Sequence, residues 1–442
     1  MRYTLNIFLI FAAQNNNMES INIITLGCSK NTIDSEVIAN SLQKEGYTVL
    51  HESAEDTDIV IVNTCSFIQD AKEESIEEIL MHAERKKAGH IKKLYVIGCL
   101  AQRYHDDLVK MLPEADGIYA YKDLGQFLKQ SDFNLLTSPR GTLSTPKHYA
   151  YLKISEGCDR HCAFCAIPNI RGKHISKPMD MVVREAEQLA SQGVKELMVI
   201  AQDSTYYGMD LNNTRQLEVL LRKLAGVKGI EWIRLHYAYP MGFPYEVLDV
   251  IRDYSQFCKY IDIPLQHISA NVLKSMNRGC TESQMYSLVE RIRTKVPGIA
   301  IRTTLLSGFP TETREDHKAL VQFVKDMRFD RLGVFSYSQE EDTPAYPLGD
   351  PIKKAEKNRR LEELMTLQEE ISLELNEAKV GSVQKVIIDE ETDEFSLGRT
   401  EFDSPEVDNE VLIDKETPLT IGEFYPIRIT EADYFDLYGK KI

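Results

Sequence analysis

The chain has 442 residues, and several features that are incompatible with a soluble enzyme are absent from it. It has no apolar run near the roughly 20 residues that a membrane-spanning helix needs, so we expect no passage through a bilayer. It has no excess of positive charge, because 52 Lys and Arg stand against 68 Asp and Glu, a formal net charge of −16. This balance argues against broad, nonspecific nucleic-acid binding. It also lacks internal repeats and low-complexity segments.

The eight cysteines do not form the pattern of a disulfide framework, because six of them fall into two sets of three in a long chain. Reduced thiols are typical of a cytoplasmic protein, and we expect that location. Residues 1–17 carry only a short apolar patch after a single Arg, at the lower limit for a secretory signal. We interpret them as an upstream start or a disordered extension.

The length predicts two to four domains, and the first spans residues 18–137. Three short runs there, INIITLG, DIVIVNT and KLYVIG, are rich in β-branched residues and are typical of strands. The stretches between them have helical spacing. This alternation predicts a parallel α/β sheet.

Each of these three strands ends in a cysteine, namely Cys28, Cys65 and Cys99. Because the carboxyl ends of parallel strands meet along one edge, where open sheets bind ligands, we expect the three thiols to converge. The structural alternative is three buried cysteines without a ligand. The same placement three times favours a metal-binding site.

Residues 138–375 contain six more strand-like runs separated by helical patterns, which predicts a partial TIM-like (β/α)6 barrel. A second set of cysteines, Cys158, Cys162 and Cys165, follows the first of these strands with CxxxCxxC spacing. Reactive groups on such barrels lie in the loops at the carboxyl face, so we expect this loop there. A long charged helix over 351–379 closes the region.

Residues 376–442 predict a small antiparallel β-barrel, because short strands alternate with Gly, Asp and Pro turns. This segment holds 17 Asp and Glu against 7 Lys and Arg, so 7 − 17 gives −10 of the total −16. A surface of this charge is suited to a basic partner.

Three thiols in one loop indicate a metal, and zinc and iron normally take four ligands. His161 and His174 lie near enough in sequence to complete a zinc site, although the loop has no second zinc-binding hook. A four-iron cluster on three cysteines would instead leave one iron open to a small molecule. If the metal were zinc, the chain would be an RNA-binding or scaffold protein without catalysis.

The sequence CDRHCAFC resembles the signature of radical S-adenosylmethionine (SAM) enzymes. This resemblance implies a 4Fe-4S cluster whose open iron chelates the amino and carboxylate groups of SAM, which is then cleaved to a 5′-deoxyadenosyl radical. It implies that Phe164 lies beside the adenine and that Gln202 and Asp203 contact the SAM amino group. It also implies that Arg302 and the LLSGFPTET stretch, at the end of the fifth strand, border the ribose and adenine.

From Met18 onward the chain resembles the methylthiotransferase family, which joins an N-terminal domain (18–137), a radical SAM domain (138–375) and a TRAM domain (376–442). The resemblance implies a second 4Fe-4S cluster on the strand-end cysteines. It implies two SAM molecules, one giving its methyl group to a sulfur at this auxiliary cluster and one supplying the radical that removes hydrogen from carbon. It also implies a flavodoxin- or ferredoxin-like electron donor. Cofactors must carry chemistry of this kind.

Two branches of the family compete, one modifying adenosine in tRNA and the other the β-carbon of an aspartate in small-subunit ribosomal protein twelve. LGCSKNTIDSE, LHYAYP and DIPLQH read like the second branch. A tRNA-gripping TRAM domain should be basic, whereas this one is acidic and suits a basic ribosomal protein, unless its charge only aids solubility. We expect a monomer that modifies the ribosomal protein and binds no specific tRNA.

The remaining candidates match no motif. Cys258 and Cys280 are expected to be structural. His267 follows the fourth strand, where it could line a substrate channel or be a satisfied polar residue. Arg171 could pair with a carboxylate of SAM or substrate, or it could fix its own loop.

Overall fold

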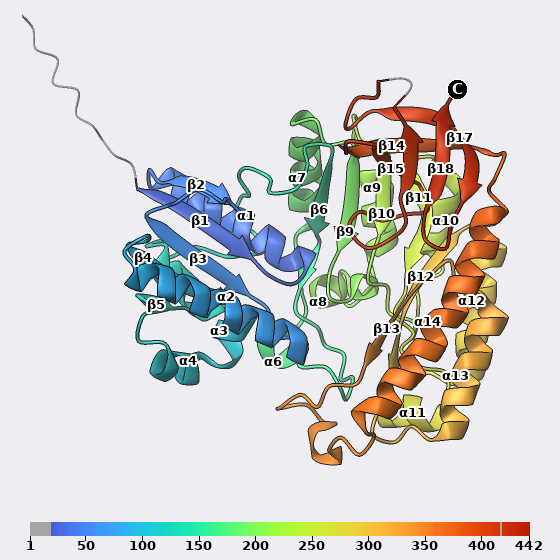
Figure 1. Cartoon of the computed structure of the whole chain (residues 1–442), viewed down its shortest axis with the longest axis horizontal. Helices are drawn as coiled ribbons and strands as arrows, with labels where there is room; N and C mark the ends of the chain where they lie inside the picture. The colour runs from blue at the N-terminus through green and yellow to red at the C-terminus, as the bar shows by residue number, and fades with distance from the viewer. Residues whose placement is uncertain (1–18, 416–417) are drawn as a thin grey trace, which may run out of the picture.

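The computed structural model describes residues 19–415 and 418–442, so the expectation for residues 1–17 lies outside the described residues. Three units follow one another along the chain (Figure 1). An N-terminal α/β unit lies beside a curved parallel sheet with outer helices, and a small closed barrel caps one end of that sheet.

The N-terminal sheet is parallel, with strand order β2-β1-β3-β4-β5. The three predicted strands form its centre: β1 (Ser20–Thr25), β3 (Ile59–Thr64) and β4 (Lys93–Gly98). The edge strands β2 (Thr48–His51) and β5 (Gly117–Ile118) are short and carry no long apolar run, so the pattern did not predict them. The helices are α1 (Ser29–Lys44), α2 (Gln69–Lys87), α3 (Cys99–Arg103), α4 (His105–Met111), η1 (Tyr121–Asp123) and α5 (Leu124–Phe127).

The second sheet has the order β13-β12-β11-β10-β9-β6 and is parallel throughout, which confirms the partial barrel. Its strands are β6 (Tyr149–Lys153), β9 (Glu196–Ile200), β10 (Trp232–Leu235), β11 (Phe257–Asp262), β12 (Ala300–Ser307) and β13 (Arg331–Ser336). Its helices and turns are α6 (Ile167–Arg171), α7 (Met179–Ser191), η2 (Ser204–Tyr206), α8 (Met209–Asn212), α9 (Leu217–Leu224), α10 (Glu246–Asp253), α11 (Ala270–Ser275), α12 (Glu282–Lys295), α13 (Arg314–Met327) and η3 (Tyr346–Leu348).

The two faces of this sheet differ in composition because side chains alternate along each strand. Leu197 and Val199 face outward and join the main apolar core with the amphipathic outer helices. Tyr149, Tyr151 and Met198 face inward and pack in a small buried cluster with Ile33 and Val37 of α1. The N-terminal unit therefore packs on the inner face of the half-barrel.

The C-terminal unit is a closed barrel in the order β14-β15-β16-β18-β17. Its pairs are antiparallel except β16 with β18, which is parallel. The strands are β14 (Val383–Glu391), β15 (Phe395–Thr400), β16 (Val411–Asp414), β17 (Phe424–Ala432) and β18 (Leu437–Lys441), and the expected charged helix precedes them as α14 (Lys354–Glu377).

This small barrel docks at the amino ends of the half-barrel strands. Ile387 shares a buried cluster with Trp232 and Ala300, the first residues of β10 and β12. Asp403 pairs with Arg331, the first residue of β13. Ser404 of this unit reaches further along the sheet and lies 3.1 Å from His236, the residue just after β10.

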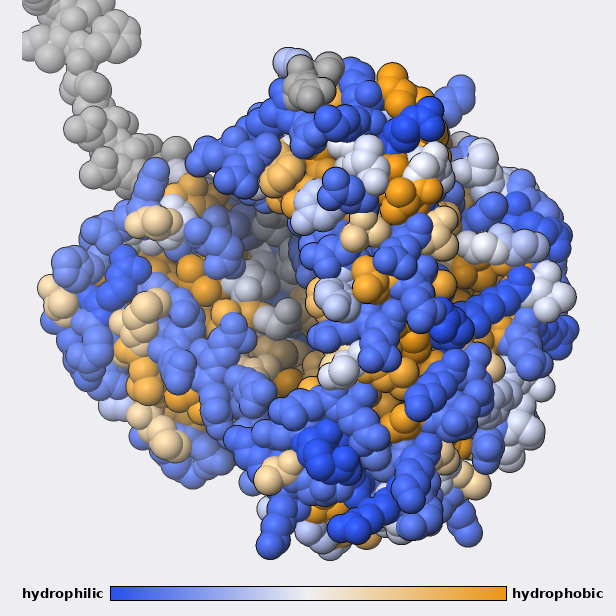
Figure 2. All heavy atoms as spheres, turned by 45° about the vertical axis from the view of Figure 1, so that its right-hand side comes forward, coloured by the Kyte–Doolittle hydropathy of each residue, from blue (hydrophilic) through white to orange (hydrophobic). Residues whose placement is uncertain are grey.

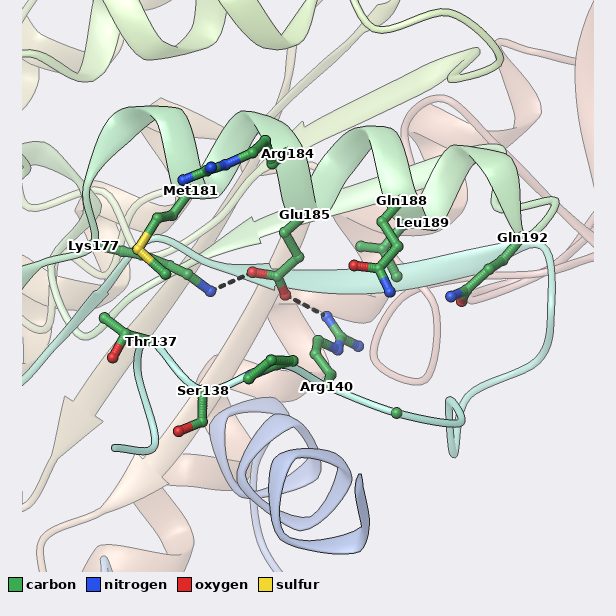
Figure 3. A pocket seen from close by; sticks show the side chains of 12 residues that line it. Thr137, Ser138, Arg140, Lys177, Met181, Arg184, Glu185, Gln188, Leu189 and Gln192 are labelled. Atoms are coloured by element: carbon green, nitrogen blue, oxygen red, sulfur yellow. Dashed lines mark hydrogen bonds and ion pairs between the residues drawn. The ribbon is translucent and has the colours of Figure 1, made fainter. Parts of the chain in front are cut away.

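The linker between the first two units lies against α7 and lines a pocket of about 220 Å³ (Figure 3). Glu185 of α7 accepts hydrogen bonds from Arg140 and Lys177, and Arg140 also pairs with Glu36 of α1 at 2.5 Å. The pocket includes none of the predicted site residues, and its charges hold the linker in place.

The molecular surface in Figure 2 is largely hydrophilic and is hollowed between the N-terminal unit and the rest of the molecule. Within the described ranges, no helix combines the length and the apolar character needed to cross a bilayer.

Candidate functional site

The CxxxCxxC loop is an excursion closed at its base by two short antiparallel strands, β7 (Ser155–Glu156) and β8 (Ile175–Ser176). Gly157 begins the excursion with φ of +75°, and a Cβ there would lie 2.1 Å from the carbonyl oxygen of Lys173. Only glycine fits this close approach. The sequence therefore fixes the entry of the loop just before Cys158.

The far side of the loop is held by the half-barrel. The amide of Ala163 donates to the carbonyl of Met276 at 2.9 Å, and the amide of Ala345 donates to the carbonyl of Ala163 at 2.8 Å. The Asn277 side chain donates to the carbonyl of His161 at 2.8 Å. These contacts fix the three cysteines over the carboxyl ends of the strands.

Burial raises the pKa of Cys158 and of Cys165 to about 12 each, and the neighbouring thiols of the set add to the rise. The described cysteines are free of disulfides. Because only thiolates bind metals, such thiols release protons when a metal binds.

The N-terminal cysteines also come together, as predicted. Burial raises the pKa of Cys65 to about 12, with smaller contributions from Cys99 and Cys28. Gly27 permits a close approach, since a Cβ there would lie 2.7 Å from the sulfur of Cys65. The carboxyl edge of the N-terminal sheet thus holds three neighbouring thiols.

Asn31 ties this edge together, although the sequence analysis missed it. Its amide donates to the carbonyl of Leu26 at 2.8 Å and to that of Thr64 at 3.0 Å. Its oxygen accepts from Arg171 at 2.5 Å and lies 3.8 Å from the sulfur of Cys99. The only available signal was its position three residues after Cys28.

The two sets of cysteines face each other across the interface between the units. Arg171 of α6, a few residues after Cys165, donates to the sulfur of Cys99 at 3.5 Å. Cys99 also shares a small buried cluster with Ala166 and Ile170. Arg171 therefore contacts Cys99, and its ion pair with Glu156 at 3.4 Å also ties it to the base of its own loop, which is one of the two roles expected for it.

The histidines considered as zinc ligands do not join the cysteines. His161 is exposed, and the imidazole of His174 bonds to Ser176. Among the described residues, no three His, Cys, Asp or Glu side chains surround a point suited to a single metal ion. A four-iron cluster does not require such a point, because each of its cysteines binds a different iron.

Phe164, which the resemblance places beside the adenine, is partly buried at the carboxyl face. Its ring packs on a buried cluster that includes Leu306 and Phe309 from the LLSGFPTET stretch, with Tyr337 beside them. The loop aromatic and the end of β12 are thus brought together at the carboxyl face.

Gln202 follows β9 and reaches toward the cysteine loop. Its amide nitrogen donates to Glu156 at 2.5 Å, whereas its buried side-chain oxygen has no partner among residues 19–415 and 418–442. A buried acceptor without a donor is costly, so this oxygen fits a ligand that donates a hydrogen bond, such as an amino group.

Asp203 is already engaged within the protein. Its carboxylate accepts from Arg160 at 2.7 Å and from the amide of Thr205 at 2.9 Å. Arg160 lies between Cys158 and Cys162 and stacks on Tyr239 at 4.1 Å. Asp203 therefore positions the cysteine loop.

Arg302 does not lie at the carboxyl end of its strand, where it was expected, and its side chain is engaged within the protein. It is the third residue of β12 and forms ion pairs with Asp262 at 3.3 Å and Asp408 at 3.2 Å. Because Asp408 belongs to the loop after β15, Arg302 takes part in docking the C-terminal unit.

His267 is fully buried and its Nδ1 accepts from the amide of Ser269 at 3.1 Å. Burial lowers its pKa to about 4. It lies 3.9 Å from Glu312, which also binds Arg360 of α14. His267 therefore lies inside the framework that supports the end of β12 and does not border open space.

The two remaining cysteines lie outside both sets. Cys258 is buried in the cluster under the C-terminal unit. Cys280 is half-buried close to Arg278, whose guanidinium donates to the sulfur of Cys162 at 3.3 Å. Arg278 and its neighbour Tyr239 were missed because no cysteine motif includes them.

Comparison with known proteins follows the same three units. Residues 20–120 match the uncharacterized protein family UPF0004, residues 152–324 match the Radical SAM superfamily and residues 380–442 match the TRAM domain. Each three-cysteine set falls inside one of the first two regions. The chain is a radical SAM enzyme.

Two relatives narrow this class to one family. A protein of Flavobacterium johnsoniae is 51% identical over 95% of this chain and 97% of its own, and one of Cytophaga hutchinsonii is 49% identical over 97% and 99%. Both are named ribosomal protein uS12 methylthiotransferase RimO. The chain belongs to the RimO family of radical SAM methylthiotransferases, which confirms the predicted family and transferase class.

A solved structure shares the fold at lower identity. The radical SAM methyltransferase TsrM of Kitasatospora setae, with tryptophan and a SAM analogue bound, superimposes with a TM-score of 0.55 at 14% identity. The match covers 83% of this chain and 78% of that one.

Proposed function

We propose that this enzyme methylthiolates the β-carbon of an aspartate in ribosomal protein uS12, using two 4Fe-4S clusters and two SAM molecules. The observation that carries the proposal is the placement of two three-cysteine sets on facing edges, linked by the hydrogen bond from Arg171 to Cys99. The names of the relatives support uS12 as the substrate.

The cysteines divide into two ligand sets. Residues 18–137 would hold the auxiliary cluster, 138–375 the cluster that binds SAM, and 376–442 would form the TRAM domain. The ligands are Cys28, Cys65 and Cys99 for the first cluster, and Cys158, Cys162 and Cys165 for the second. When bound, these cofactors supply the radical chemistry and the methylthio group that side chains cannot provide.

The chain's own residues would bind and orient SAM. Phe164 offers an aromatic face, and the unpartnered oxygen of Gln202 would accept a hydrogen bond from the SAM amino group. Asp203 would act indirectly, by holding Arg160 and the cysteine loop.

A basic substrate fits the charge that remains exposed on the C-terminal unit. The acids of that unit serve in part internally, since Asp403 and Asp408 pair with arginines of the half-barrel. The hairpin between β14 and β15 still presents a group of exposed acids: Glu390, Glu391, Asp393 and Glu394. We further propose a cytoplasmic monomer that receives electrons from a flavodoxin- or ferredoxin-like donor and binds no specific tRNA.

The test combines iron content with product analysis. The reconstituted protein should hold about eight irons, two clusters of four. Replacing either cysteine set with alanine should remove about half of them, while full iron in either variant would contradict the assignment. Mass spectrometry of uS12 from a deletion strain should show loss of the methylthio group. Loss from tRNA adenosine instead would support the alternative, MiaB-type activity.

A further inference from the structure

An arginine–tyrosine pair contacts the N-terminal cysteines. The guanidinium of Arg171 donates to the sulfur of Cys99 at 3.5 Å, and the hydroxyl of Tyr121 lies 3.2 Å from the same sulfur. The guanidinium lies 4.3 Å from the centre of the Tyr121 ring. Both side chains thus contact Cys99, one ligand of the proposed auxiliary cluster.

A second pair contacts the cysteines of the half-barrel in the same manner. Arg278, in the turn after α11, donates to the sulfur of Cys162 at 3.3 Å. The hydroxyl of Tyr239 lies 3.7 Å from that sulfur, and its ring centre lies 4.5 Å from the Arg278 guanidinium. In each cysteine set, one sulfur is therefore contacted by one arginine and one tyrosine that lie outside the cysteine motif.

The two arginines differ in their other partners. Arg171 also pairs with Asp34 at 2.5 Å and with Glu156 at 3.4 Å, so its charge is balanced in large part within the protein. Arg278 is 3% exposed, donates to the carbonyl of Pro264 and, within the described part of the chain, has thiols and a tyrosine rather than a carboxylate as its titratable neighbours. A buried cation without a counter-charge is costly, so a thiolate ligand set is its natural partner.

We propose that these pairs are positioning residues that set the reduction potentials of the two clusters separately, each pair raising the potential of its own cluster. The inference rests on the proposed function. A cluster on three thiolates is anionic and gains one further negative charge on reduction. A nearby positive charge and N–H···S hydrogen bonds therefore stabilise the reduced state more than the oxidised state.

The test uses full-length protein carrying one cluster at a time, obtained by replacing the other cysteine set with alanine. Each cluster is titrated with dithionite and followed by electron paramagnetic resonance, which reports the midpoint potential without reference to activity. The variants are Arg171→Gln, Arg171→Lys and Tyr121→Phe for the auxiliary cluster. Arg278→Gln, Arg278→Lys and Tyr239→Phe serve the SAM-binding cluster.

We expect each Gln variant to lower the ratio of reduced to oxidised cluster about tenfold at fixed potential, which is about 59 mV for a one-electron couple. The Lys variants keep the charge and should recover part of the shift. The Phe variants keep the ring and should show a smaller shift in the same direction. They also keep the test valid if a Gln variant fails to fold.

The matched control is Arg140→Gln, which breaks another buried ion pair between the units without touching a cysteine. It should leave both potentials unchanged. Arg171→Gln and Arg278→Gln are each introduced into both single-cluster proteins. The inference is overturned if either variant leaves the potential of its own cluster unchanged, if it shifts both potentials alike, or if Arg140→Gln produces the same shift. Failure of the proposed function would be visible separately, as wild-type protein that holds no second cluster.

Discussion

The ammonium of Lys153, the last residue of β6, lies 2.5 Å from the carboxylate of Asp34 on α1, and the two side chains are only 2% and 1% exposed. Asp34 also pairs with Arg171, so one carboxylate of the N-terminal unit meets two cations of the half-barrel. This buried group fixes the edge that carries Cys28, Cys65 and Cys99 against the CxxxCxxC loop.

Replacing Asp34 with Ala should therefore destabilise the whole protein. Removing one partner of a buried ion pair leaves an uncompensated charge and typically costs about 3–5 kcal/mol. Urea unfolding followed by circular dichroism would measure the change. The control is Asp56→Ala, which breaks an exposed pair with Arg85 and should cost about 1 kcal/mol or less. Equal losses in the two variants would refute the claim that the Asp34 pair fixes the interface.

Gly157→Ala should prevent assembly of the SAM-binding cluster, because the new Cβ would meet the carbonyl of Lys173. The matched control is Gly172→Ala. Gly172 also has a positive φ, of +76°, but a Cβ there would meet nothing within 4 Å. Both variants place a Cβ at a positive φ, which costs on the order of 1–3 kcal/mol, and only Gly157→Ala adds the clash. We expect Gly157→Ala to lose about half of the bound iron and Gly172→Ala to retain it. Similar iron contents would show that the close approach is unimportant.

Much of the architecture was accessible from the sequence because the central strands are apolar runs that end in cysteines. The residues that contact those cysteines could not be predicted from the sequence. Asn31 contacts Arg171, and Arg278 contacts Cys162, across more than one hundred residues of chain. Such contacts depend on how the units dock, which no local pattern records. The acidic C-terminal unit was interpreted through its total charge, although Asp408 in fact pairs with Arg302 inside the molecule.

Docking of the C-terminal unit should weaken in acid. Burial alone would raise the pKa of Asp389, but Arg399 and His148 beside it bring that pKa below its usual value. A carboxylate with a lowered folded pKa contributes stability above about pH 3.9, the unfolded value, and loses it as pH falls toward the folded pKa. The stability difference between wild type and Asp389→Asn should therefore shrink between about pH 4 and pH 3. Urea midpoints across this range would measure it. Asp393→Asn, on the exposed turn, should show a constant difference, and a constant difference for Asp389→Asn would contradict the assignment.

The exposed acids of the β14–β15 hairpin should speed the encounter with a basic substrate. Reversing the charge of Glu390, Glu391 and Glu394 to Lys should slow association with uS12 by about tenfold at low salt, with a smaller effect at high salt. Stopped-flow measurements with labelled uS12 would give the association rate constants. Glu362→Lys, Glu370→Lys and Glu377→Lys together, at exposed positions of α14, are the control with the same change of net charge. An equal slowing in the control would show that the hairpin has no specific role.

Replacing Gln202 should weaken SAM binding, whereas replacing Arg302 should not. Gln202→Ala removes a buried acceptor without a protein partner, so the dissociation constant for SAM should rise by about tenfold, or about 1.4 kcal/mol. Arg302→Ala breaks the pairs with Asp262 and Asp408, so it should lower the urea midpoint and leave SAM affinity unchanged. Equilibrium dialysis of anaerobically reconstituted protein would measure both constants. A residue that serves only in docking makes no contact with SAM, so its loss should not change the affinity for SAM. If Arg302→Ala lost as much SAM affinity as Gln202→Ala, Arg302 would belong to the SAM site and its assignment to the interface would be overturned.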